Sequence, residues 1–147
     1  MIIDATDLIV GRLATVAAKK ALLGEKVDIV NCENAILSGD KVRLLESWKH
    51  KRSMGTYKGP LYGRLSDRIV RRIIRGMLPY KQPKGREAFK RIMCFRGVPT
   101  VLKDQKMIYI EDAHLSKLST PKFLRVGELS KLIGGSRTSD SMKAGGE

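Results

Sequence analysis

The residues best suited to chemistry in this sequence are four closely spaced arginines, Arg68, Arg71, Arg72 and Arg75. A guanidinium group is planar and donates paired hydrogen bonds to phosphate oxygens. If the segment is an α-helix with 3.6 residues per turn, all four side chains fall within a stripe about 100° wide. The spacing therefore predicts a helix face that binds phosphate groups, in preference to an arginine face that is only solvated.

The positive charge of the chain is concentrated in its middle. The 147 residues include 29 Lys and Arg against 15 Asp and Glu, which gives a net charge of +14. Residues 1–40 sum to −2 and residues 97–147 to +2, whereas residues 41–96 hold 17 basic and three acidic residues. Charge that only keeps a protein in solution does not need to be segregated in this way. The segregation predicts a polyanionic partner, whose counterions are released on binding.

A glycine-rich loop precedes the arginines. Residues 53–65 read SMGTYKGPLYGRL, so glycines alternate with Tyr57, Lys58, Tyr62 and Arg64. Glycine lets a backbone approach phosphates closely, and tyrosine rings stack on unpaired bases. An ordinary loop with its tyrosines packed on the core fits the composition equally well. Because Gly and Pro make this basic segment a poor membrane-surface helix, nucleic acid is the preferred polyanion.

The residues expected to contact nucleic acid come from this basic segment. The cations are chosen from the charge partition and the arginine spacing, and the tyrosines as candidates for contacts with bases or sugars. The full set is Lys49, Lys51, Arg52, Tyr57, Lys58, Tyr62, Arg64, Arg68, Arg71, Arg72, Arg75, Lys81, Lys84 and Arg86.

The elements that must position these residues begin with a strand–helix–strand pattern. Residues 1–4 and 26–32 are apolar runs of strand length, and residues 10–23 form a helix that ends at Gly24. The alanines of this helix fall on one face, which would let it pack closely against a sheet. The order of these elements predicts an α/β unit with parallel strands. Residues 35–37 extend the second strand or form another short one.

The later elements follow from turn and capping residues. A turn at residues 38–40 leads into a helix through Lys49. In the arginine helix, Ser66 is expected as the N-cap, and the helix ends before Pro79, because proline disfavours helical geometry in the residue before it. The remaining expectations are a basic loop at residues 80–86, a helix at 87–95, a strand at 107–110 and a last helix at 126–133.

Several kinds of site are missing from the sequence. The turn after the first strand contains one glycine, Gly11, where a dinucleotide-binding turn needs three. Cys32 and Cys94 have no CxxC companion, and His50 and His114 stand alone, so we expect no metal ion, cofactor or small-molecule substrate and treat both cysteines as buried thiols. The chain also lacks a signal peptide and an apolar run of membrane-spanning length, which predicts a soluble intracellular protein.

Two other functions compete with RNA binding. A Rossmann-like RNA-modifying enzyme needs a glycine-rich cofactor turn and acid–base residues, and neither such a turn nor a GxSxG elbow occurs here. A DNA-compacting protein would bind duplexes with a helix-turn-helix or a β-ribbon, and neither motif is apparent. Glycine-rich loops suit irregular RNA better than a regular groove. RNA is therefore the leading partner.

Short motifs spread along the chain give it a resemblance to the ribosomal protein L13 family, a universal family of the large ribosomal subunit. They occur in family order and cover residues 1 to about 135. The N-terminal motifs are Asp4-Ala5, Gly11-Arg12-Leu13-Ala14, Val30-Asn31-Cys32-Glu33 and Ser38-Gly39. The later and more specific motifs are Arg75-Gly76-Met77-Leu78-Pro79, Lys81, Gly85-Arg86, Ala88, Arg91, Gly97 and Pro99.

Two departures indicate the branch of the family. Tyr57-Lys58-Gly59-Pro60 stands where bacterial members carry a Tyr-Pro-Gly-Gly-like loop, and Gly97-Val98-Pro99-Thr100 stands where they carry His-Pro-His. The chain is therefore more similar to the archaeal and eukaryotic branch. Its brevity favours the archaeal type, since eukaryotic members carry extended C-termini.

The resemblance implies a three-layer α/β/α fold with a small, mostly parallel sheet. We expect one domain over residues 1–133, with its basic segment at 41–96, and a flexible low-complexity tail at 134–147. By resemblance, the chain is a structural, non-catalytic constituent of the large ribosomal subunit that binds large-subunit (23S-type) rRNA and supports subunit assembly. Its other partners would be neighbouring large-subunit ribosomal proteins, and its location the cytoplasm.

Overall fold

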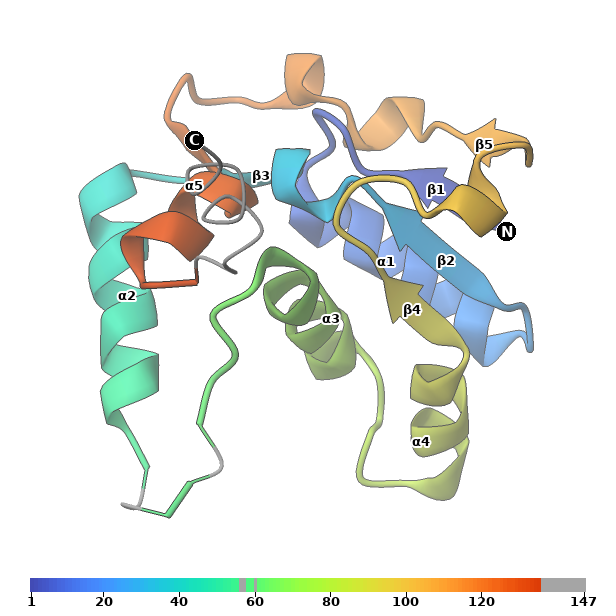
Figure 1. Cartoon of the computed structure of the whole chain (residues 1–147), viewed down its shortest axis with the longest axis horizontal. Coiled ribbons are helices and arrows are strands. Elements are labelled where there is room, and N and C mark those ends of the chain that lie inside the picture. Colours follow the sequence, from blue (N-terminus) through green and yellow to red (C-terminus); the bar gives the residue numbers. More distant parts are fainter. Residues whose placement is uncertain (56–57, 60, 136–147) are drawn as a thin grey trace, which may run out of the picture.

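The computed structural model describes residues 1–55, 58–59 and 61–135. Its central sheet is formed by β1 (Ile2–Asp4), β2 (Val27–Val30), β4 (Ile92–Cys94) and β5 (Met107–Ile108). Neighbouring strands are parallel, in the order β4-β2-β1-β5 (Figure 1). In the register, Ile3 lies opposite both Ile29 and Ile108. The predicted α/β class and its mostly parallel sheet are confirmed.

Helices cover one face of this sheet. They are α1 (Val10–Leu22), α3 (Ser66–Met77) and α4 (Pro83–Lys90), and α1 packs against both of the others. The predicted small-residue face of α1 is confirmed, because Ala14, Ala17, Ala18 and Ala21 are all buried. Alanine side chains allow close approach of neighbouring helices and strands, so the arginine helix α3 is held firmly against the core.

The opposite face of the sheet is covered by a segment without an α-helix. Ile2 of β1 and Val30 of β2 pack there against Leu102, which belongs to a 3-10 turn (Thr100–Leu102). Phe95, Val98 and Met107 complete this smaller cluster. The third layer of the fold is therefore a thin one, and the helical layer provides most of the core.

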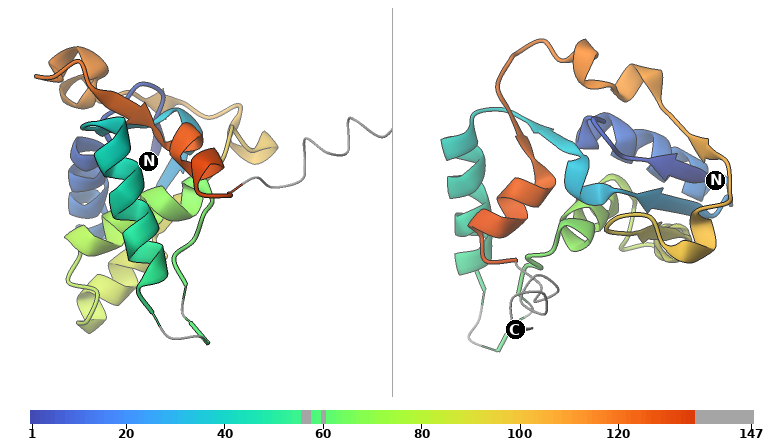
Figure 2. Two further views of the ribbon diagram at one scale, coloured as in Figure 1. Left: turned by 90° about the vertical axis from the view of Figure 1, so that its left-hand side faces the viewer. Right: turned by 45° about the horizontal axis from the view of Figure 1, so that its top comes forward.

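A second, antiparallel sheet joins β3 (Ile36–Ser38) to β6 (Phe123–Arg125). It is linked to β2 by a 3-10 turn (Cys32–Asn34) and carries α2 (Lys41–Ser53) and α5 (Val126–Leu132). Figure 2 shows α2 standing apart from the central sheet, with the chain after it returning to α3. This arrangement brings Lys51 of α2 close to α3, since the two line one cleft.

The predicted helix at residues 87–95 is wrong. The helix is α4, which begins earlier at Pro83, and Ile92–Cys94 is a strand that pairs with β2. Proline is well suited to the first position of a helix, because its missing N–H would have no partner there. Ile92 and Cys94 are buried whereas Met93 is exposed, the alternation of a strand. The second half of the predicted basic loop at 80–86, residues 83–86, therefore belongs to α4.

Smaller differences concern the ends of elements. Ser66 is the first residue of α3 and makes no capping hydrogen bond, so its predicted N-cap role is wrong. The strand at 107–110 is reduced to two residues, and β6 was not predicted. Of the predicted tail at 134–147, residues 136–147 lie outside the described residues, and the domain limit at 133 stays a prediction. Within the described ranges, no helix is long and apolar enough to cross a membrane.

Candidate nucleic-acid interface

The helix α3 has the two faces that its sequence predicts. Ile69, Val70 and Ile74 are buried in the main core. On the other side lie Arg68, Arg71, Arg72 and Arg75, which we call the arginine face; Arg68 is exposed and the other three are half-buried. Because Arg71, Arg72 and Arg75 are partly buried, neighbouring residues restrict the conformations of their side chains.

Aromatic rings hold three of the four guanidinium groups. The guanidinium carbon of Arg72 lies 3.3 Å from the ring centre of Tyr62, that of Arg71 lies 4.6 Å from Phe89, and that of Arg75 lies 4.9 Å from Tyr80. A cation over a ring is attracted by the negative face of the π system. Beyond the ring contacts, the guanidinium N–H groups remain available to acceptors, except the Nε–H of Arg71, which is buried without a partner among the described residues.

The arginine face lines a cleft beside α4. Its walls come from all four arginines together with Leu61, Gly63 and Phe89, and its volume is about 280 Å³. At Gly63 a Cβ atom would lie 2.9 Å from the Cβ of Arg68, so the glycine lets the loop run close to the helix. Asp67, in the first turn, makes a long ion pair with Arg68, with 3.9 Å between Oδ2 and Nε. The charge of the cleft stays strongly positive.

A second cleft lies between α2 and α3. Its lining includes Trp48, Tyr62, Tyr80 and the cations Lys51, Arg72 and Arg75, and its volume is about 240 Å³. Trp48 is buried and meets Tyr62 edge to face, with 6.2 Å between ring centres and 82° between planes. The ammonium of Lys51 lies 5.1 Å from the centre of the Trp48 ring. We call this lining set the aromatic cleft.

Most of the other predicted contact residues are exposed around these clefts. Arg52 and Arg64 differ, because they donate to backbone carbonyls at the end of α5: Arg52 to Ile133 at 3.0 Å and Arg64 to Gly134 at 3.5 Å. Tyr57 lies outside the described residues. Besides Arg64 and Arg68, the exposed members of the predicted set are Lys49, Lys58, Lys81, Lys84 and Arg86.

Three aromatic residues of the interface were missed by the sequence reasoning. Trp48 and its cation Lys51 lie three residues apart on α2, so this pair could have been found from spacing along one helix. Tyr80 and Phe89 lie on other elements than the arginines that they contact, and only the fold brings these pairs together. Spacing along one helix cannot reveal a ring supplied by another element.

The turn after α3 depends on a glycine at its far end. Gly85 is buried in α4, and a Cβ atom there would lie 2.1 Å from the carbonyl oxygen of Pro79. Real Cβ atoms do not approach a backbone oxygen so closely, so any side chain at this position would push the turn away. Gly85 thus fixes where Tyr80 and Lys81 stand relative to the arginine face.

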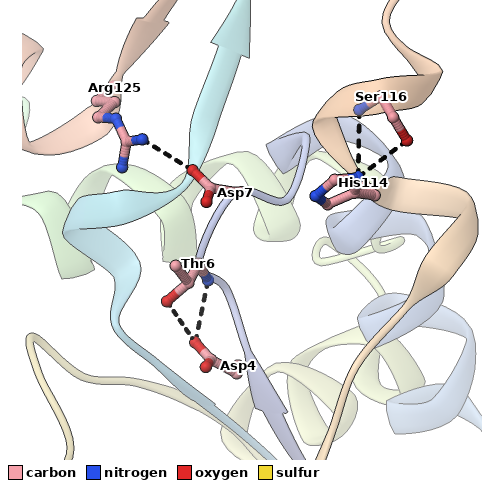
Figure 3. A network of polar contacts seen from close by, with 6 residues as sticks. All are labelled: Asp4, Thr6, Asp7, His114, Ser116 and Arg125. Atoms are coloured by element: carbon pink, nitrogen blue, oxygen red, sulfur yellow. Dashed lines mark hydrogen bonds and ion pairs between the residues drawn. The ribbon is translucent and has the colours of Figure 1, made fainter.

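The carboxyl ends of β1 and β2 carry a second polar cluster, shown in Figure 3. Asp4 Oδ1 accepts hydrogen bonds from the backbone N–H of Thr6 at 3.0 Å, from its hydroxyl at 2.7 Å and from Asn31 Nδ2 at 3.0 Å. Burial on its own would raise the pKa of Asp4, but the hydrogen bonds from Asn31 and Thr6 outweigh it and lower the pKa below its usual value.

We call the whole cluster the carboxyl edge. Its remaining members also form hydrogen bonds with one another. Asp7 Oδ1 accepts a hydrogen bond from Arg125 Nη2 at 2.8 Å. His114 Nδ1 lies 2.9 Å from the hydroxyl of Ser116 and accepts from its backbone N–H at 3.3 Å (Figure 3). In the part of the chain that the structure describes, no three His, Cys, Asp or Glu side chains gather closely enough to hold a metal ion.

Comparison with known proteins gives a consistent result. The family model for ribosomal protein L13 matches residues 1–100. The large ribosomal subunit protein uL13 of Methanosarcina barkeri is 44% identical over 135 residues, which cover 90% of this chain and 96% of that protein. Its counterpart in Methanococcoides burtonii is 42% identical over 134 residues, with 90% and 96% covered. That of Haloarcula marismortui is 37% identical over 138 residues, with 94% and 93% covered.

Proposed function

The chain belongs to the ribosomal protein L13 family, and on that premise we propose that it binds large-subunit rRNA through the arginine face and the cations around it. It is a structural constituent of the large ribosomal subunit, located in the cytoplasm, and not an enzyme. Its relatives named above are archaeal, in agreement with the branch expected from the sequence. Neither the RNA-modifying enzyme nor the DNA-compacting protein finds support in this family.

One observation supports the proposal above all others. Arg71, Arg72 and Arg75 are oriented by aromatic rings, yet among the described residues none of them has a protein acceptor for a hydrogen bond. A guanidinium held in place loses little conformational entropy when it binds, so its hydrogen bonds contribute more fully to affinity. Phosphate oxygens supply paired acceptors that match the guanidinium edge.

The remaining predicted contacts fit around this centre. Arg52 and Arg64 already donate to the backbone at the end of α5, and each guanidinium carries five donors, so both retain groups for a phosphate. Tyr62 contributes by holding Arg72. The cations proposed to contact phosphates at the edge of the interface are Lys49, Lys51, Lys58, Lys81, Lys84 and Arg86.

The test is binding measured across a salt series. Large-subunit rRNA is compared with an unrelated structured RNA and with duplex DNA of equal length. Each phosphate contact steepens the slope of log affinity against log salt by about 0.7 to 0.9. We expect a steep slope and a clear preference for the rRNA at physiological salt. Equal affinity for all three polymers would contradict the proposal and leave a basic protein without a specific RNA site.

We propose neighbouring large-subunit proteins as the second class of partner. The edge strand β5 and the residues on either side of it expose Val101, Ile108 and Tyr109, whose exposed fractions are 78%, 42% and 47%. Figure 1 shows β5 far from α3, so a protein could bind there without competing with RNA. A photo-crosslinking amino acid at Val101 should attach to protein in assembled subunits, and one at Arg68 should attach to RNA. RNA at both positions would contradict this assignment.

A further inference from the structure

The aromatic cleft combines exposed ring surface with positive charge. Tyr80 is 40% exposed although its ring meets Arg75, so part of the phenol surface is open to the cleft. Lys51 and Arg72 stand on the same walls, and no carboxylate occurs among the described residues that line the cleft. This mixture suits a ligand that has a flat π face and carries negative charge, which is the chemistry of a nucleotide.

The volume of the cleft narrows the choice of ligand. About 240 Å³ corresponds to roughly eight water molecules, since a water occupies about 30 Å³ in the liquid. Pockets for drug-sized ligands begin at about 300 Å³. A base that is paired in a helix offers only its edges, whereas an unpaired base can be turned out of its stack and laid against a ring. The cleft is therefore smaller than a drug-sized pocket and suits a ligand no larger than one such base.

Gly76 supplies an independent observation on the same wall. It is the next-to-last residue of α3, and a Cβ atom built there would meet no atom within 4 Å. Its φ is not in the left-handed region, so neither backbone conformation nor packing within the chain requires glycine. Glycine within a helix is unfavourable relative to alanine, because its backbone loses more conformational entropy. The missing side chain leaves open space along the cleft, as a ligand that approaches the backbone would require.

We propose that the aromatic cleft holds one unpaired RNA base. The base stacks on Tyr80 and passes over the bare backbone at Gly76, while Lys51, Arg72 and Arg75 bind the phosphates on either side of it. The inference rests on the proposed function, since it takes the ligand to be RNA. It adds a contact that depends on a base, where the arginine face alone would depend on phosphates.

The first experiment compares two probes that differ only in their bases. A ten-nucleotide oligoadenylate and a ten-residue abasic oligonucleotide are titrated into the full chain at the same low salt. Binding is followed by the fluorescence of Trp48, the single tryptophan, whose ring lines the cleft. Because stacking on an aromatic side chain favours a base, we expect the oligoadenylate to bind roughly 5- to 150-fold more tightly.

Substitution of Tyr80 locates the effect. Tyr80→Leu should abolish the preference for the oligoadenylate and leave the affinity for the abasic probe unchanged. Tyr109→Leu is the matched control, because Tyr109 is similarly exposed, at 47%, but lies after β5 outside the cleft. The inference is overturned if wild type binds both probes equally, if it binds neither, or if the two variants behave alike.

A pair of glycine substitutions provides a second check in which stability and binding change in opposite directions. Gly76→Leu should raise the thermal midpoint, since leucine favours helix over glycine, and should weaken oligoadenylate binding at least several-fold by filling the cleft. Gly11→Leu is the control, because Gly11 is also exposed in a helix with no atom within 4 Å of its Cβ position. It should leave binding unchanged. Unchanged binding in Gly76→Leu would contradict the inference.

The proposed function can fail separately from this inference. Tyr80→Leu should still prefer large-subunit rRNA to duplex DNA and should keep the salt slope of wild type, because its phosphate contacts remain. If wild type prefers the rRNA but does not distinguish the oligoadenylate from the abasic probe, the base site is wrong and the proposed function stands. If wild type shows no preference for the rRNA, the proposed function itself is wrong.

Discussion

The carboxyl edge of the parallel sheet and the arginine face of α3 both contain several charged side chains, but these side chains have different kinds of partner. At the carboxyl edge, Asp4 is bonded to Thr6 and Asn31, and Asp7 to Arg125. On the arginine face, three guanidinium groups rest on aromatic rings and have no hydrogen-bond acceptor within the described part of the chain. One region satisfies its own charges, and the other retains the hydrogen-bonding capacity that we propose for RNA.

The contrast matters because open α/β sheets generally bind their ligands beyond the carboxyl ends of the strands. In this chain that position is filled by internal hydrogen bonds, and the positive charge lies over the helical layer instead. In the proposed function, the fold is a scaffold that displays α2, α3 and α4 to RNA. The proposed binding surface therefore lies away from the position that fold class alone predicts.

Reversal of charge on the arginine face should produce the largest effect. Arg71→Glu with Arg72→Glu removes two phosphate contacts and adds repulsion, so we expect rRNA affinity at low salt to fall by at least about 100-fold. The slope of log affinity against log salt should fall by about 1.4 to 1.8, since each lost contact accounts for about 0.7 to 0.9. Binding isotherms across the salt series measure both quantities.

The matched control changes the net charge by the same amount elsewhere. Lys103→Glu with Lys106→Glu alters two exposed cations that line neither cleft. This variant should lose much less affinity and retain most of the slope. Circular dichroism checks that both variants are folded. Equal losses in the two variants would mean that overall charge, and not the arginine face, determines binding.

The carboxyl edge should respond in stability and not in binding. Asp4→Ala leaves the donors of Thr6 and Asn31 without their acceptor, which costs about 1–3 kcal/mol of unfolding free energy. Because the pKa of Asp4 is lowered in the folded state, its contribution is present above the unfolded value of about 3.9 and is lost as pH falls through the folded pKa. Denaturant titrations of wild type and variant should converge in that acidic range.

The same variant sharpens the comparison between the two regions. Asp104→Ala is its control, since Asp104 is an exposed aspartate of the turn before β5, and it should change stability by less than about 0.5 kcal/mol. RNA affinity should stay at the wild-type value in both. A large loss of RNA affinity in Asp4→Ala would show that the carboxyl edge takes part in binding and would remove the distinction.

Some of this structure could be predicted because it follows from the spacing and order of residues that are close in the sequence. The burial of one side of α3 and the alanine face of α1 follow from residue spacing along one helix. The parallel pairing of the first two strands follows from the strand–helix–strand order. The start of α3 was predicted less accurately, because Ser66 begins the helix without capping it. Family resemblance, carried by short motifs, supplied the ribosomal role.

What could not be predicted depends on contacts between distant elements. The stretch after Lys90 has a helix-like composition, but Ile92 and Cys94 are drawn into a strand because β2 offers a free edge. Likewise, Arg71 meets Phe89 and Arg75 meets Tyr80 only when α4 and the turn before it fold back on α3. Sequence spacing located the cations, and tertiary packing decided which of them are oriented.

The smallest effect expected is that of the ion pair between Asp7 and Arg125. Their side chains are 36% and 45% exposed, so solvent screens an attraction that the 2.8 Å separation alone would make large. A double-mutant cycle with Asp7→Asn and Arg125→Gln should give a coupling free energy of about 0.2–1 kcal/mol. Asparagine is chosen because Asp7 has a φ of 54°, a conformation that asparagine tolerates well. A coupling well above that range would mean that the pair stabilises the carboxyl edge as strongly as Asp4 does. Because neither residue belongs to the arginine face, rRNA affinity should be the same at all four corners of the cycle.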